Sequence, residues 1–128
     1  MRELMFRGKT AKDGRWIISD SIAQYPDGDV HLYDEVTHTE PEVIPETVGQ
    51  FIGLTDKNGV NIFEGDIIRV TPDPRYSGLS SIEHAGLFEV VFEGASFYMT
   101  RNHSTLYYFT PSDECTVVGN IHDNGDLL

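Results

Sequence analysis

The residue types that most often carry chemistry are present in this chain, but they do not form a known pattern. Metal-binding histidines are commonly separated by one or three residues. No two of the five histidines are spaced in this way, and the nearest approaches are His38 with Glu40 and His122 with Asp123 and Asp126. We therefore predict structural or solvent-exposed roles, and no metal site, for the histidines, which are His31, His38, His84, His103 and His122.

Cys115 is the single cysteine, so it cannot form an intramolecular disulfide. A nucleophilic thiol needs a nearby base and cationic surroundings, whereas Asp113 and Glu114 beside Cys115 have the opposite effect. The chain has no Gly-x-Ser-x-Gly elbow and no glycine-rich phosphate cradle. We expect a buried or strand-end thiol, no catalytic or cofactor-binding residue, and a non-enzymatic protein. An enzyme of unrecognised type is the remaining alternative.

The distribution of charge is more informative than the net charge of −12. Nine acids and no Lys or Arg lie from Trp16 through Asp56, and four acids and no Lys or Arg lie from Asn102 to the end. Nucleic-acid binding depends on cationic surface, so most of this surface would repel a phosphate backbone. The exception is a basic cluster formed by Arg2, Arg7, Lys9, Lys12 and Arg15. The acid excess provides solubility or, alternatively, a docking face for a basic partner.

An aromatic-rich patch is predicted near the C-terminal third of the chain. On a small barrel such a face could stack bases, but that use needs interleaved cations and only Arg101 is close. Packing across neighbouring strands and a protein-binding surface are the other two readings. The patch consists of Phe97, Tyr98, Tyr107, Tyr108 and Phe109.

The first half of the chain reads as two hairpins that would position these groups. Strands at 4–8 and 15–19 flank a turn with Asp13-Gly14, and strands at 22–25 and 30–33 flank Pro26-Asp27-Gly28-Asp29. Residues 34–42 are polar and acidic, so we predict a loop there. Pro45–Val48 can form one helical turn, which Gly49 would end.

The second half reads as further short strands. They are predicted at 50–54, 66–70, 86–93, 95–100, 106–109 and 115–121, with a bulge or close backbone approach at Gly119. Residues 71–85 are expected to form a mobile loop and 122–128 a short tail. The predicted fold class is mainly β, a small barrel-like or bent antiparallel sheet with N-terminal hairpins and little helix.

Compartment and domain number follow from length and composition. At 128 residues the chain fits a single domain, 1–128. No apolar run is long enough to span a membrane, and the start of the chain lacks the apolar segment of a signal peptide. A secreted domain of this size often carries several cysteines. We therefore expect a cytoplasmic protein without membrane contact.

The segment around Gly53–Val70 is the most specific feature of the sequence. Residues 50–68 read Gln-Phe-Ile-Gly-Leu-Thr-Asp-Lys-Asn-Gly-Val-Asn-Ile-Phe-Glu-Gly-Asp-Ile-Ile. Asn58-Gly59 permits a tight turn, Gly65 accepts a backbone conformation closed to other residues, and Asp66 can bond nearby backbone N–H groups. All of these predicted roles are architectural.

This segment resembles the YopX family, a group of small proteins found largely in bacteriophages and prophages. The upstream Pro45–Gly49, the closing Val117-Val118-Gly119-Asn120-Ile121 and, more weakly, Phe6–Lys9 are also similar to family patterns. The departure is Ile52, where Thr is usual. The resemblance extends over about residues 4–124, with a variable middle at 71–115. It implies a single YopX-like domain, a mostly-β fold and a phage or prophage origin, but no reaction.

Two functions of different classes therefore stand as hypotheses. The first is a phage accessory protein that binds another protein, such as a host factor, or assembles with itself. The second is a small β-barrel that binds nucleic acid in phage replication or regulation, through the basic cluster. The regions where we expect function are the acidic loop 34–46, the loop 71–85 and the aromatic strands 97–109.

Overall fold

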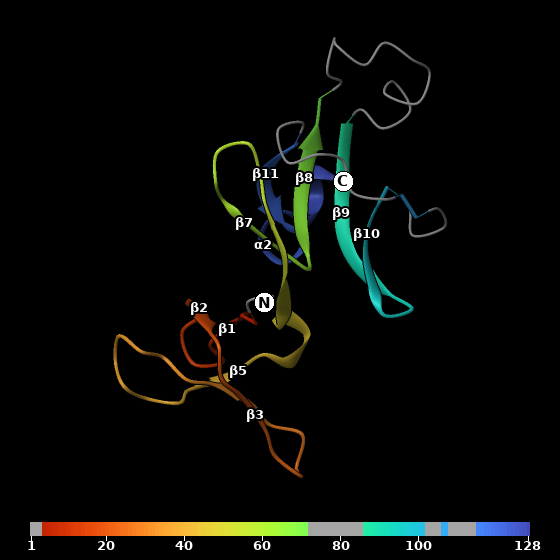
Figure 1. The fold of residues 1–128 in the computed structure, drawn as a ribbon. Coiled ribbons are helices and arrows are strands. Elements are labelled where there is room, and N and C mark those ends of the chain that lie inside the picture. Colours follow the sequence, from red (N-terminus) through yellow and green to blue (C-terminus); the bar gives the residue numbers. More distant parts are fainter. Residues whose placement is uncertain (1–3, 72–85, 102–105, 108–114) are drawn as a thin grey trace. The chain divides into compact units, whose positions relative to one another are not determined.

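Short strands joined by tight turns make up most of the regular structure (Figure 1). The computed structural model describes residues 4–71, 86–101, 106–107 and 115–128. Contacts between residues divide the chain into two compact units, Met1–Phe51 and Ile52–Leu128. The mainly β fold class with little helix is confirmed. That residues 1–128 act as one domain stays a prediction.

The first unit begins with the predicted hairpin. Strands β1 (Phe6–Lys9) and β2 (Trp16–Ser19) are antiparallel and pair along their whole length. Gly14 lets the chain reverse with a φ of 69°, and its N–H donates to the carbonyl of Thr10 at 2.9 Å. On its other edge β1 pairs with the first residues of β6 (Gly49–Thr55), the strand in which the first unit ends.

The second predicted hairpin is also confirmed. Strands β3 (Ile22–Gln24) and β4 (Val30–Leu32) are antiparallel. Val30 and Leu32 are buried while His31 between them is half-buried. This is the alternation that a strand with one covered face should show.

The prediction of a loop over 34–42 is wrong at its end. There the chain forms β5 (Glu42–Val43), which pairs with β4. The physical reason is Val43, which is fully buried in the core of the first unit with Ile17, Val30 and Leu32. The predicted helical turn follows as η1 (Pro45–Thr47), a 3₁₀ helix with Pro45 at its start.

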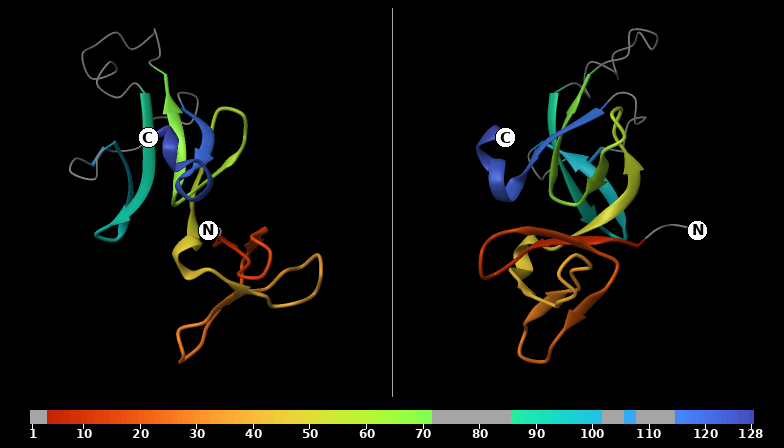
Figure 2. Two further views of the ribbon diagram at one scale, coloured as in Figure 1. Left: turned by 180° about the vertical axis from the view of Figure 1, so that it is seen from behind. Right: turned by 90° about the vertical axis from the view of Figure 1, so that its left-hand side faces the viewer.

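The second unit is organised around one curled, half-barrel antiparallel sheet (Figures 1 and 2). Its strand order is β10 (Ser96–Thr100), β9 (Gly86–Glu93), β8 (Asp66–Val70) and β11 (Cys115–Asn120). The short strand β7 (Asn61–Phe63) lies next to β6. The core beneath these strands is formed by Ile52, Ile62, Ile68, Val70, Phe88, Val90, Met99 and Cys115.

The C-terminal residues form short helices in place of the predicted tail. The strand expected to reach Ile121 ends at Asn120, where α2 (Ile121–Asn124) begins, followed by the 3₁₀ helix η3 (Gly125–Leu127). The Asn120 side chain caps α2 by accepting from the N–H groups of His122 and Asp123, at 3.0 and 2.9 Å. Within the described residues, no helix has the length and apolar character needed to cross a membrane.

Two predictions lie largely outside the described residues. The first is the mobile loop over 71–85, of which residues 72–85 are not described. Of the predicted strand 106–109, only the first two residues are described, and Tyr107 exchanges backbone hydrogen bonds with Met99 at 2.9 and 3.0 Å.

The predicted irregularity at Gly119 is confirmed. The register between β11 and β8 shifts between Val117 and Gly119, which marks a bulge. Gly119 also lies against Asn124: a Cβ atom there would be 2.5 Å from Oδ1 of that side chain. The same oxygen accepts the backbone N–H of Asn120 at 3.2 Å. Because Gly119 has no side chain, the bulge and the helix α2 can pack closely against each other.

We expect Gly119→Ala to destabilise the fold by about 1 kcal/mol, because Asn124 must move and its hydrogen bond to Asn120 is then lost. Urea unfolding followed by circular dichroism measures the change. Gly125→Ala is the matched control, since a Cβ atom there meets nothing within 4 Å and its φ of −57° is helical. Equal unfolding midpoints for the two variants would contradict this packing.

Candidate functional site

The carboxylate of Asp56 joins the two halves of the family-like sequence pattern. One oxygen, Oδ1, accepts the backbone N–H groups of Asn58 and Val60 at 2.8 and 2.9 Å and so closes the turn after β6. The other oxygen, Oδ2, accepts the N–H of Val117 in β11 at 2.9 Å. The N–H of Lys57 also donates to the carbonyl of Cys115 at 3.1 Å. A single buried side chain therefore connects segments 61 residues apart.

The environment of Asp56 favours its ionised form. Burial acts to raise the pKa of this carboxyl, but the N–H groups of Val117, Val60 and Asn58 and the charge of Lys57 outweigh it and hold the pKa below its ordinary value. A carboxylate that accepts hydrogen bonds from three backbone N–H groups stabilises the fold. Its bonding partners are backbone groups, as a structural role requires.

The corner before β8 uses the other two residues that the sequence singled out. Gly65 has a φ of 91°, which confirms the predicted need for glycine. The buried Asp66 accepts the backbone N–H of Phe63 at 2.8 Å, as predicted. The N–H of Ile121 donates to the carbonyl of Gly65 at 2.9 Å, which is a second link between the two sequence blocks.

The basic cluster of the first unit is largely engaged by its own neighbours. The guanidinium carbon of Arg7 lies 5.0 Å from the centre of the Trp16 ring, and the ammonium of Lys9 lies 5.7 Å from it. Both distances are typical of cation–π contacts. Lys12 is exposed, and Arg2 lies outside the described residues.

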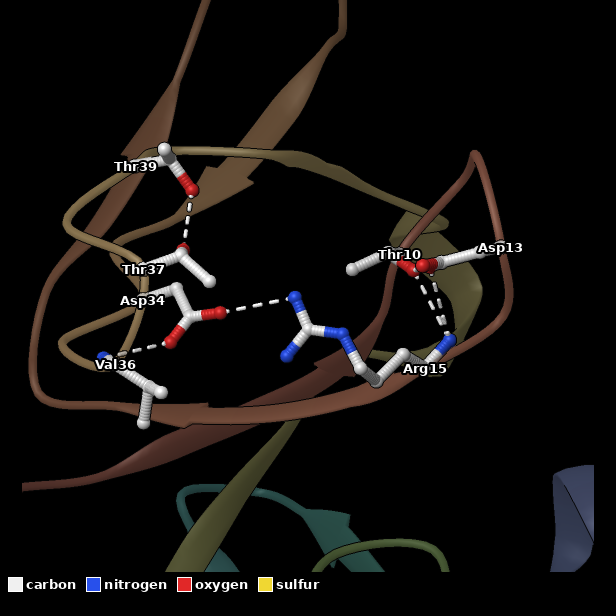
Figure 3. A network of polar contacts seen from close by, with 7 residues as sticks. All are labelled: Thr10, Asp13, Arg15, Asp34, Val36, Thr37 and Thr39. Carbon is white, nitrogen blue, oxygen red and sulfur yellow. Dashed lines mark hydrogen bonds and ion pairs between the residues drawn. The ribbon is translucent and has the colours of Figure 1, made fainter.

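Arg15 is held by an ion pair in the polar network of the first unit (Figure 3). Its guanidinium donates to Asp34 Oδ2 at 3.0 Å, while Asp34 Oδ1 accepts the N–H of Val36 at 3.0 Å. The Arg15 guanidinium lowers the pKa of Asp34, against the opposing effect of burial. On the other side, Thr10 donates to Asp13 and accepts the N–H of Arg15 at 3.0 Å. This network orders the start of the acidic loop.

An apolar groove of about 500 Å³ opens on the first unit. Its lining comes from the hairpin β3–β4 and from the turn around η1. Ile22 is 41% exposed at the groove, whereas Val30 is buried beneath it. The lining residues are Ile22, Gln24, Val30, Pro45 and Val48.

Sequence reasoning did not predict this groove. The sequence singles out the acidic loop 34–46, which contains Pro45, but not the residues of the hairpin β3–β4 that also line the groove. The one lining residue that stands out in the structure is Ile22, a large apolar residue that is exposed in a short strand. Because the lining residues come from segments separated by 15 residues or more, for example Val30 and Pro45, spacing alone does not bring them together.

Comparison with known proteins identifies a family whose model covers the central segment. The family model described as YopX protein matches residues 5–128. This chain belongs to the YopX family. The match spans both compact units and includes the segments that Asp56 and Gly65 link.

A solved structure supports the same fold. The YopX-family chain is similar to the crystal structure of protein EF1440 from Enterococcus faecalis, with a TM-score of 0.56 and 22% sequence identity. The likeness covers 100% of this chain and 99% of that chain. At this identity it shows the fold alone. Comparison with curated protein sequences finds no match.

The histidines that the structure describes each lie in a different local setting. His31 bonds the carbonyl of Glu40 through Nδ1 at 2.7 Å, and His38 bonds the hydroxyl of Tyr33 at 3.2 Å. His122 lies in α2, and His84 and His103 lie outside the described residues. In the part of the chain that the structure describes, no three His, Cys, Asp or Glu side chains gather as a metal site would require.

Cys115 and the aromatic residues contribute to the core of the second unit. Cys115 is 1% exposed at the start of β11, as predicted for a buried thiol. Phe97 and Tyr107 pack against the core, and the Tyr107 ring meets Phe88 edge-on at 5.6 Å. Cross-strand packing therefore accounts for these two aromatic residues. Tyr108 and Phe109 lie outside the described residues.

We expect Asp56→Asn to destabilise the fold by about 2–3 kcal/mol at pH 7, because an amide N–H₂ would face an N–H donor that the carboxylate now accepts. Urea unfolding at pH 3 to 7 measures the effect. The lowered pKa means that the contribution of Asp56 is complete above the ordinary value of about 3.9 and is lost as the pH falls through the folded-state pKa. The variant should therefore lose part of the acid dependence.

Asp27→Asn is the matched control for this experiment. Asp27 is exposed, and its carboxylate accepts one hydrogen bond within its own turn, from the N–H of Asp29 at 3.0 Å. We expect a change below about 0.5 kcal/mol. If Asp56→Asn were as mild as this control, Asp56 would not be the link that the geometry indicates.

Proposed function

We propose that this YopX-family chain is a phage- or prophage-derived accessory protein that acts without catalysis, by binding another protein or a copy of itself. The observation that carries the proposal is the open apolar groove of the first unit, lined by Ile22, Val30 and Val48 among others. Exposed apolar recesses with polar surroundings are typical of protein-binding sites. Burying one aliphatic side chain in such a recess contributes about 1.5–3 kcal/mol.

The use of the sequence motif supports a role without catalysis. Asp56, Gly65 and Asp66 are the most specific residues of the central segment, and each is used to join strands or to form a turn. Catalytic acids are usually placed in a cleft with a perturbed pKa that suits proton transfer. The pKa of Asp56 is instead lowered by backbone donors, so this carboxyl remains ionised at neutral pH.

Protein binding predicts a stoichiometric complex. Affinity capture of the tagged chain from bacterial cells, followed by reconstitution from purified components, should give either a defined complex with one partner or a mass above that of the 14.4 kDa monomer in light scattering. The tag alone is the control. A monomeric mass together with no partner that survives reconstitution would overturn the proposal.

Nucleic-acid binding is the second candidate, and one observation favours it. Trp16 lies beside the cationic groups of Arg7 and Lys9, and an aromatic ring with basic side chains can support base stacking. The eight acids that follow Trp16 in the first unit oppose it, because they repel phosphate over the same unit.

This alternative predicts a gel shift of single-stranded DNA or RNA at micromolar protein in low salt. The shift should weaken in Arg7→Gln and in Trp16→Ala, since these remove the cation and the ring of the pair. Arg69→Gln is the control, because Arg69 is an exposed cation of β8 outside the basic cluster. No shift at micromolar protein would exclude this second function, and the protein-binding proposal expects that result.

A further inference from the structure

The groove of the first unit is apolar in its walls and floor. Val30 and Val48 belong to or pack against the core of that unit, while Ile22 and Pro45 stand exposed at its sides. Among the described lining residues, Gln24 carries the one polar side chain. The groove is therefore suited to an apolar side chain, with one amide that can bond a neighbouring peptide group.

The segments that form the groove are acidic and contain no positive charge. Asp29 directly precedes Val30, Glu46 directly follows Pro45, and Asp20 lies two residues before Ile22. No Lys or Arg occurs between Trp16 and Asp56. Arg15, the nearest cation before this stretch, is bound to Asp34 at 3.0 Å. Negative charge around an apolar recess favours a ligand that carries positive charge beside an apolar group.

We propose that the groove binds a segment of a partner protein in which an apolar side chain is flanked by Lys or Arg. The apolar side chain would lie against Val30 and Val48, and the flanking cations would lie near Asp29 and Glu46. This inference rests on the proposed protein-binding function and names the chemistry of the partner.

A second copy of this chain fits the groove less well than a different protein. Its own basic and apolar segment around β1 is already paired with β2 and β6. Each copy also carries a net charge of −12, so two copies repel each other over most of their surface. Self-association through the groove is therefore an outcome that the test must be able to show.

The test uses nuclear magnetic resonance of the ¹⁵N-labelled full chain with three short synthetic peptides. The probe is acetyl-Lys-Lys-Leu-Leu-Lys-Lys-amide. One control replaces every Lys by Glu and the other replaces every Leu by Ser. We expect the probe to shift the amide signals of Ile22, Gln24, Val30 and Val48, and to lose affinity as salt is added. Each control should bind at least tenfold more weakly.

Two pairs of variants locate the binding site. Ile22→Ser should weaken binding of the probe at least fivefold, whereas Ile18→Ser should not, because Ile18 is 56% exposed but does not line the groove. Glu46→Lys should weaken it through charge, whereas Glu35→Lys should not, because it makes the same charge reversal at an exposed position that is not adjacent to a lining residue. Circular dichroism of each variant confirms that it is folded.

The results distinguish this inference from the proposed function. No shift at the groove with millimolar probe, or equal binding of the Glu peptide, would overturn the inference. If a reconstituted partner then bound elsewhere on the chain, the protein-binding function would stand without it. Shifts at the groove that grow with protein concentration in the absence of peptide would identify a second copy as the occupant and would also overturn the inference.

Discussion

The second unit depends on one buried carboxylate. Asp56 accepts the N–H groups of Asn58, Val60 and Val117, and it does so as an anion because these donors overcome the cost of burial. The turn after β6 is thereby attached to β11, the strand at the edge of the curled sheet. Backbone donors at these positions would lack a partner if the carboxylate were removed, so the bonds support one another.

The corner at Gly65 and the bulge at Gly119 also connect segments that are distant in the sequence or closely packed. Gly65 takes a positive φ and accepts the N–H of Ile121, while Gly119 leaves room for Asn124. Residues of the segments that resemble the YopX pattern are thus ones that bend and connect the strands. A specific sequence pattern can arise from geometry, because few residues other than glycine and short acids satisfy these backbone conformations.

The groove that carries the proposed protein binding lies in the first unit. The core of this unit is small, formed by Ile17, Val30, Leu32 and Val43, and part of its apolar surface remains open as a groove. The segments that form the groove contain acids and no Lys or Arg, and with the apolar lining this supports the proposed ligand with both apolar and basic groups. Three cations of this unit contact their own neighbours: Arg15 pairs with Asp34, and Arg7 and Lys9 lie against Trp16, while Lys12 is exposed.

The sequence by itself determined the local structure of this protein. Asp13-Gly14, Pro26–Asp29 and Asn58-Gly59 predicted turns, and the alternation around Val30 predicted a strand, because backbone conformation and side-chain direction are local properties. The family pattern was also readable from spacing. Only the tertiary structure showed β5, the helix α2, the bond from Asp56 to Val117 and the groove. β5, the bond from Asp56 to Val117 and the groove depend on contacts between segments far apart in the chain, and such contacts leave no periodic signal in the sequence. The helix α2 depends on the side chain of Asn120, which caps it directly after β11.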